Sequence, residues 1–181
     1  MIKIKIIVCI KQVPGNTDVR IDKDTNTLIR EGIENIVNPF DTYAIEEAVR
    51  IKERLIDNKV FDQEEIETIA LTMGPMQAEN ILRDAISVGI DRAILLSDKA
   101  FAGSDTLATS STLAAAIKKI GKYKVILFGK QTLDGDTAQV GPELAHFLNI
   151  PFMGYVNDIL EMDKRKIVIK RLMDDRYETF D

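Results

Sequence analysis

Cysteine, histidine and tryptophan are nearly absent from this chain of 181 residues, which has one cysteine, one histidine and no tryptophan. Because Cys9 is alone, an internal disulfide and any metal or iron–sulfur site built only from this chain's cysteines are excluded. His146, the only histidine, falls in the middle of a predicted helix, where a core or partly exposed role is favoured over catalysis, and the sequence offers no recognisable Ser–His–Asp grouping or cluster of histidine and carboxylates around a metal. We therefore expect no catalytic side chains and no metal site, and we interpret Cys9 as a small core residue.

Long apolar runs and an excess of positive charge are also missing. No stretch approaches the roughly 20 apolar residues of a membrane span, and Met1–Lys5 lacks the layout of a signal peptide. The formal net charge of −5 leaves no basic stripe that would follow a nucleic-acid backbone. We expect a cytoplasmic protein without a nucleic-acid partner, and a single domain over residues 1–181, since this length fills one core but not two.

Short strands and longer helices are predicted to alternate along the chain. Ile4–Ile10 is a nearly continuous aliphatic run, which is typical of a strand buried on both faces of a parallel sheet. Asn38 and Pro39 suit the cap and first position of a helix. Further strands are predicted at Ile66–Met73, Arg92–Leu96 and Lys124–Phe128, and further helices at Gln77–Val88, Ser104–Ile120 and Thr137–Leu148. This alternation predicts an α/β fold with a doubly wound, mostly parallel sheet and helices on both faces.

Two segments depart from this pattern. Val19–Arg30 contains two short β-prone pieces around the turn-rich Lys23–Asn26, which predicts a surface hairpin. Lys166–Arg171 alternates with period two and is followed by Asp174-Asp175 and Tyr177–Phe180. This order predicts a C-terminal antiparallel hairpin.

The loop Gly129–Thr137 is the most polar segment that follows a predicted strand. In open parallel sheets, ligands bind beyond the carboxyl ends of the strands, where the strand order reverses. The loop contains a lysine, two aspartates and two glycines, and Gly141 follows it. It matches neither the P-loop pattern nor the dinucleotide fingerprint, so a different nucleotide geometry is required.

The charges in this loop limit where a phosphate is expected. A helix starting near Thr137 aims the N–H groups of Thr137 to Val140 at the loop, together with about half a positive charge. A carboxylate about 4 Å from a phosphate costs roughly 1 kcal/mol in water and more in a protein. Asp134 and Asp136 are therefore expected to point away and to cap the helix, hold Lys130 or accept a ribose hydroxyl.

Simpler interpretations of the same residues remain open. Asp136 is equally well explained as an ordinary helix cap and Gly129 as an ordinary strand end. The polar loop Ser97–Thr106, taken alone, is a solvated loop with Ser104 as the cap. Gly74-Pro75 permits close approach of a flat ring to the backbone, or forms a tight turn between a strand and a helix.

Several motifs, in order along nearly the whole chain, resemble the electron-transfer flavoprotein beta subunit, including its nitrogen-fixation-associated members. They are Val8–Pro14, Asn38–Asp41 with Ala44–Glu46, Met73–Pro75, and Gly129–Gln131 through Gly141–Glu143. The resemblance implies an adenine-nucleotide α-hydrolase-like fold and pairing with an alpha subunit that carries a redox-active FAD. It also implies a nucleotide pocket formed by Cys9, Asn38, Phe40, Asp41, Met73, Gly74, Val125, Gly129, Lys130, Gln131, Asp134, Gly135, Asp136, Thr137, Ala138, Gln139 and Val140.

The resemblance leaves two ligands, and FAD is favoured over AMP. Ordinary members hold a structural AMP, and their loop reads Cys-Asn-Gln-Thr-Gly where this chain has Asp134–Pro142. The present version is similar to members from anaerobes that bind a second FAD and bifurcate the electrons of NADH. This similarity implicates Ser97, Asp98, Phe101, Gly103, Asp105 and Thr106 as well. It also implies an acyl-CoA-type dehydrogenase or another redox partner, with bifurcation only in the heterodimer.

Family members continue well beyond the point that matches Asp181, so we expect the C-terminal arm and the docking loop of the family to be absent from residues 1–181. An electron carrier subunit is the favoured function, and a non-redox AMP module is the first rival. A stand-alone ATP-binding hydrolase of the same fold is the second rival. It requires a phosphate-anchoring glycine motif and a candidate base, and the sequence has neither.

Overall fold

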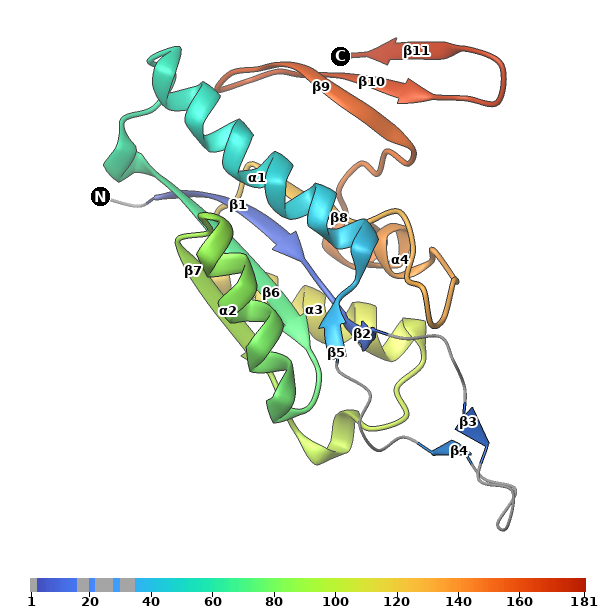
Figure 1. The fold of residues 1–181 in the computed structure, drawn as a ribbon. Coiled ribbons are helices and arrows are strands. Elements are labelled where there is room, and N and C mark those ends of the chain that lie inside the picture. The colour runs from blue at the N-terminus through green and yellow to red at the C-terminus, as the bar shows by residue number, and fades with distance from the viewer. Residues whose placement is uncertain (1–2, 16–19, 22–27, 30–34) are drawn as a thin grey trace.

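A four-stranded parallel sheet forms the centre of the molecule (Figure 1). The computed structural model describes residues 3–15, 20–21, 28–29 and 35–181. The strands are β1 (Ile4–Cys9), β6 (Ile66–Met73), β7 (Arg92–Leu96) and β8 (Val125–Phe128), in the order β7-β6-β1-β8. These match the predicted strands to within one residue, and the α/β prediction is confirmed.

The strand order reverses between β1 and β8. β1 pairs with β6 from Ile4↔Ile66 to Cys9↔Leu71, and with β8 from Ile6↔Val125 to Cys9↔Phe128. The chain builds outward through β6 and β7 on one side of β1, and then crosses to place β8 on the other side. The carboxyl ends of β1 and β8 therefore form the position where open sheets of this kind bind ligands.

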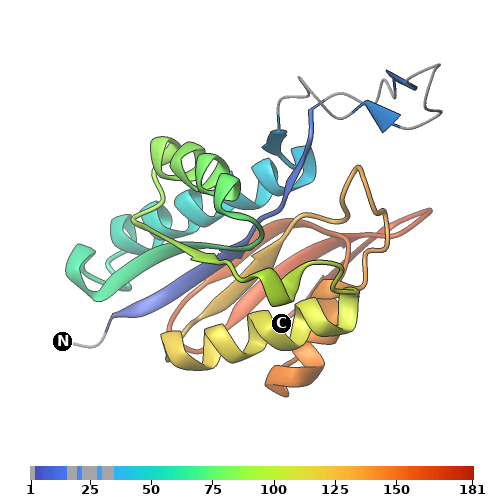
Figure 2. The ribbon, with the colours of Figure 1, turned by 90° about the horizontal axis from the view of Figure 1, so that it is seen from below.

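Helices cover both faces of the sheet (Figure 2). α1 (Pro39–Asp57) and α2 (Glu79–Val88) cover one face, where they pack on Ile6 and Val8. α3 (Thr106–Ile120) and α4 (Val140–Leu148) cover the other, where they pack on Ile7 and Cys9. Successive residues of β1 point to opposite faces, so a continuous apolar strand serves both layers.

Three helices begin later than the sequence predicts. A short 3-10 helix, η2 (Met76–Ala78), precedes α2. α3 begins at Thr106 because the Asp105 carboxylate accepts the N–H of Ala108 at 2.8 Å, so Asp105 is the cap and Ser104 is not. α4 begins at Val140 instead of Thr137, because Asp136 (φ 51) and Ala138 (φ 52) have left-handed backbone conformations that a right-handed helix excludes. The predicted N-cap role of Asp136 is therefore wrong.

Two small antiparallel pairs follow β1. β2 (Gln12–Pro14) pairs with β5 (Asn35–Val37), and β3 (Arg20–Ile21) pairs with β4 (Leu28–Ile29). The strands of the predicted hairpin are thus confirmed. Its predicted turn, Lys23–Asn26, lies outside the described residues.

The C-terminal region forms a three-stranded antiparallel sheet, ordered β11-β10-β9. β10 (Ile167–Leu172) and β11 (Tyr177–Phe180) are the predicted hairpin, and β9 (Val156–Met162) is an additional strand. β9 was missed because only Ile159 and Met162 in it are buried, which breaks the alternation that identifies a strand. Both side chains join the core on the α1 side of the central sheet.

Candidate functional site

One buried carboxylate joins the ends of the two strands between which the order reverses. Asp41 lies in the first turn of α1, and its side chain accepts the N–H of Lys11 at 2.7 Å and the N–H of Gly129 at 3.2 Å. Lys11 follows β1 and Gly129 follows β8. Asp41 therefore fixes the positions from which the loops after β1 and β8 depart.

Asn38 holds the next part of the loop Gly129–Gln139, which is called the glycine loop below. Its side chain is fully buried, donates to the carbonyl of Gln131 at 2.8 Å and accepts the N–H of Leu133 at 3.3 Å. Asn38 occupies the N-cap position of α1 as predicted, but its side chain makes no capping bond to the helix. The amide instead orders a loop that lies far away in sequence.

The environment of Asp41 is unusual for a charged group. Burial raises the pKa of Asp41 to about 6, although hydrogen bonds from Lys11, Asn38 and Gly129 partly oppose that rise. Burial also raises the pKa of the adjacent Cys9 thiol well above its usual range, and the Asp41 charge adds to this effect. Cys9 is therefore held as a neutral thiol, which suits a core position and not a nucleophile.

Gly129 is required for the contact between α1 and β8. A Cβ atom at this position would lie 2.3 Å from Asp41 Oδ1 and 2.6 Å from the carbonyl carbon of Phe40. No side chain fits between the strand end and the first turn of the helix. Gly129 is therefore more than an ordinary strand end.

Two charged side chains of the loop, Asp134 and Lys130, have defined contacts. Asp134 accepts two hydrogen bonds from Lys11 Nζ, at 2.7 and 2.8 Å. Burial tends to raise the pKa of Asp134, but Lys11 and Thr132 outweigh this and leave it below its usual value. Lys130 Nζ lies instead 5.3 Å from the ring centroid of Tyr155. Lys11, and not Lys130, is thus the partner of Asp134, a pairing that the sequence did not predict.

The end of the loop presents unpaired backbone N–H groups. Left-handed Ala138 (φ 52) is followed by right-handed Gln139 (φ −98, ψ −27). Consecutive residues of opposite hand turn successive N–H groups toward a common point and form an anion-binding nest. Within residues 35–181 the N–H groups of Ala138, Gln139 and Val140 donate no hydrogen bond. Pro142 in the first turn of α4 has no N–H to offer.

The second polar loop is held mainly by its own carboxylates. Asp98 accepts the N–H of Ala100 at 2.8 Å in the 3-10 helix η3 (Lys99–Phe101), and Asp105 caps α3. Gly103 has a positive φ of 78° and is exposed. The hydroxyl of Thr106 lies 3.4 Å from Gln139 Oε1, so this loop meets the glycine loop directly.

Of the remaining predicted site residues, all but Val125 lie at or near the carboxyl edge of the parallel sheet. Gly74 donates its N–H to the carbonyl of Leu96 at 3.0 Å, which ties the ends of β6 and β7 together at the same edge. Val125 differs, because it begins β8 opposite Ile6 and packs against the core away from the carboxyl edge. Along that edge, or in the loops that leave it, lie Cys9, Phe40, Met73, Ser97, Phe101, Gly135 and Thr137.

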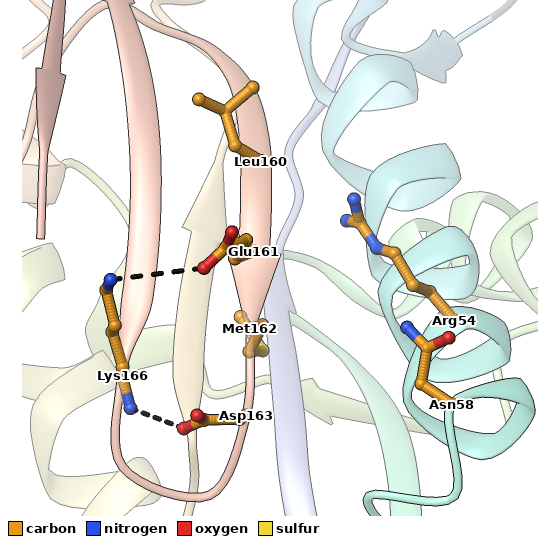
Figure 3. A pocket seen from close by; sticks show the side chains of 7 residues that line it. All are labelled: Arg54, Asn58, Leu160, Glu161, Met162, Asp163 and Lys166. Atoms are coloured by element: carbon orange, nitrogen blue, oxygen red, sulfur yellow. Dashed lines mark hydrogen bonds and ion pairs between the residues drawn. The ribbon is translucent and has the colours of Figure 1, made fainter.

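A separate pocket lies near the C-terminal end of α1, against the hairpin of β9 and β10 (Figure 3). It is lined by Arg54, Asn58, Leu160, Glu161, Met162, Asp163 and Lys166. Arg54 Nη1 donates a hydrogen bond to the carbonyl of Ile159 at 2.6 Å, and Lys166 Nζ lies 3.9 Å from Glu161 Oε2. None of these residues comes from the carboxyl edge of the sheet.

Outside the gaps in residues 1–34, no three His, Cys, Asp or Glu side chains are grouped so that they could hold a metal ion. Of the helices that the structure describes, none has the length and apolar character to cross a membrane.

The comparisons with known proteins agree on one family. Residues 25–180 match the model described as the electron transfer flavoprotein domain. Caffeyl-CoA reductase-Etf complex subunit CarD of Acetobacterium woodii is 46% identical over 98% of this chain and 64% of its own length. Electron transfer flavoprotein subunit beta of Thermoanaerobacterium thermosaccharolyticum is 47% identical over 96% of this chain and 62% of its own length. Protein FixA of Azorhizobium caulinodans is 45% identical over 92% of this chain and 58% of its own length.

The chain thus spans about three-fifths of the length of the relatives it matches, with covered shares of 64%, 62% and 58%. The residues that match the family model, 25–180, include every strand and helix from β4 to β11 (Tyr177–Phe180).

Gly129→Ala tests the close contact between α1 and β8. The new Cβ would lie 2.3 Å from Asp41 Oδ1, so we expect the free energy of unfolding in urea to fall by about 2–4 kcal/mol. Gly135→Ala is the matched control, since its Cβ would lie 3.5 Å from Thr132 Oγ1, an ordinary contact. Equal effects of the two substitutions would contradict this account of Gly129.

The pKa of Asp41 predicts a specific pH dependence of stability. Its pKa of about 6 in the folded protein lies above the ordinary aspartate pKa of 3.8. The stabilisation of the folded state that this carboxyl provides is therefore fully present below about pH 4, and it is lost as the pH rises through about 6. We expect the difference in unfolding free energy, wild type minus Asp41→Asn, to fall by about 1 kcal/mol per pH unit in that window. Urea unfolding from pH 4 to 7.5 measures it, and a constant difference would refute the assignment.

Proposed function

This chain belongs to the electron transfer flavoprotein family, and on that premise we propose that it serves as a beta-type subunit holding an adenine nucleotide at the carboxyl edge of β1 and β8. The nucleotide we favour is the ADP portion of FAD. The observation that carries the proposal is the group of N–H donors of Ala138, Gln139 and Val140, which make no hydrogen bond within residues 35–181. They lie at the end of a loop fixed by Asn38 and Asp41.

The charges around the loop suit a phosphate at these N–H groups. Lys11 already holds the Asp134 carboxylate, so this negative charge is partly neutralised. The backbone donors supply the favourable field without a lysine or arginine next to the phosphate. This differs from the site expected at the first turn of a helix starting near Thr137, because the donors belong mostly to the loop and only Val140 belongs to α4.

The chain's own residues would bind and orient the nucleotide, while a bound FAD would supply the redox chemistry through its flavin ring. Asp41 and Asn38 fix the glycine loop, and the loop Ser97–Asp105 closes the same edge beside it. The exposed, positive-φ Gly103 leaves space at that loop for a ligand longer than AMP. This space supports FAD.

The wider role follows from the relatives. One relative is named as a subunit of a caffeyl-CoA reductase–Etf complex, and another as an electron transfer flavoprotein beta subunit. We propose pairing with an alpha subunit, electron exchange with an acyl-CoA-type dehydrogenase or another redox partner, and NADH as the donor in electron bifurcation. The alternative is an ordinary beta subunit with a structural AMP, since the same N–H groups serve the phosphate of either ligand.

The ligand itself is tested on the complex of this chain with its alpha subunit. We expect the purified heterodimer to release two FAD per pair, measured from the visible spectrum and protein concentration after denaturation. One FAD together with AMP in the released material would overturn the FAD assignment. The absence of any adenine nucleotide bound by this chain would overturn the proposed function.

Substitutions at Ala138 test the nest. Ala138→Val places a β-branched residue at φ 52 and is expected to weaken nucleotide binding about 10-fold, whereas Ala138→Gly retains it. Ala108→Val on the exposed side of α3 is the matched control. Isothermal titration with AMP and FAD measures the affinities, and unchanged affinity in Ala138→Val would remove the nest from the binding site.

A further inference from the structure

Glu143 connects the two polar loops through the helices that follow them. Its carboxylate accepts the hydroxyl of Thr106 at 3.0 Å through Oε1 and lies 2.9 Å from the hydroxyl of Ser110 through Oε2. Glu143 is in the first turn of α4, and the two hydroxyls are in the first two turns of α3. One side chain therefore spans the contact between both helix starts.

Ser110 is the buried partner of Glu143 in the contact between α3 and α4. Its side chain is fully buried, and three oxygens surround its hydroxyl: Thr106 O at 2.7 Å, Glu143 Oε2 at 2.9 Å and Val140 O at 3.3 Å. A hydroxyl has one hydrogen to donate, and Glu143 is the only carboxylate among these acceptors. Without Glu143, the buried hydroxyl would keep only backbone acceptors, and α4 would lose its side-chain connection to Ser110.

The carboxylate also offsets an electrostatic cost of the fold. α3 and α4 both begin at the carboxyl edge of the sheet and pack side by side on one face (Figure 2). Each helix start carries a partial positive charge, so two adjacent starts repel each other. Glu143 places a negative charge between them and is bonded to residues of both.

We propose that Glu143 is a positioning residue that couples the loop Ser97–Asp105 to the loop Gly129–Gln139. The proposal rests on the proposed nucleotide site between these loops. The first backbone bond of α4 runs from Glu143 N to Gln139 O at 3.1 Å, so Glu143 is directly linked to the N–H nest. A shift of α4 against α3 would move that nest relative to Gly103 and change the space for the ligand.

Hydrogen exchange on the full 181-residue chain tests the coupling without ligand. Glu143→Ala is expected to speed amide exchange in both loops together by about 10-fold, while β1 remains unchanged. Glu143→Gln keeps the shape and one acceptor and is expected to give a smaller increase. Glu53→Gln, an exposed position on α1, removes the same charge and is expected to change neither loop. An increase confined to one loop, or spread equally over the chain, would overturn the coupling.

A second measurement separates positioning from general stability. AMP titration is expected to show about 10-fold weaker binding for Glu143→Ala, with no further loss when Thr106→Val is added, because both remove the same contact. Fully additive losses would overturn the proposed route through Thr106. If the wild-type chain binds neither AMP nor FAD, the proposed function fails, and the exchange experiment still decides whether Glu143 couples the loops.

Discussion

The burial of the Asp41 carboxylate between the N–H groups of Lys11 and Gly129 is the constraint on which the ligand-facing edge depends. It sets the distance between the ends of β1 and β8 and leaves no space for a side chain at position 129. Because the carboxylate is removed from water, its pKa rises to about 6. The contact that organises the site is thus held at some cost to stability near neutral pH.

The rest of the site follows from that junction. Asn38 holds the next turn of the loop through Gln131 and Leu133. Beyond it, Lys11 holds Asp134, and Glu143 fixes the start of α4 against α3. The carboxylates of Asp41, Asp134 and Glu143 therefore serve the protein's own structure. This leaves the backbone as the source of phosphate donors, which explains how a loop with two aspartates can suit an anionic ligand.

Sequence patterns identified the loop but not its internal contacts. The strand–helix alternation and the polarity of residues 129–137 pointed to the edge of the sheet at which we propose the nucleotide, because both depend on local composition. The helix start at Thr137 was predicted wrongly because left-handed Asp136 and Ala138 have no glycine to mark them. Glu143 was missed because, in sequence alone, a glutamate in a first helical turn has an ordinary role with the helix dipole.

The sequence by itself determined the four strands of the parallel sheet, the helices between them and the burial of β1 on both faces, and it pointed to the edge at which we propose a nucleotide. These features follow from periodicity and from the handedness of crossovers, which act over short segments. Only the tertiary structure decided the partners of Asn38, Asp41 and Lys11, which lie 93, 88 and 123 residues away in the chain at Gln131, Gly129 and Asp134. Polar side chains at such separations have many equivalent partners in sequence, and packing alone selects one.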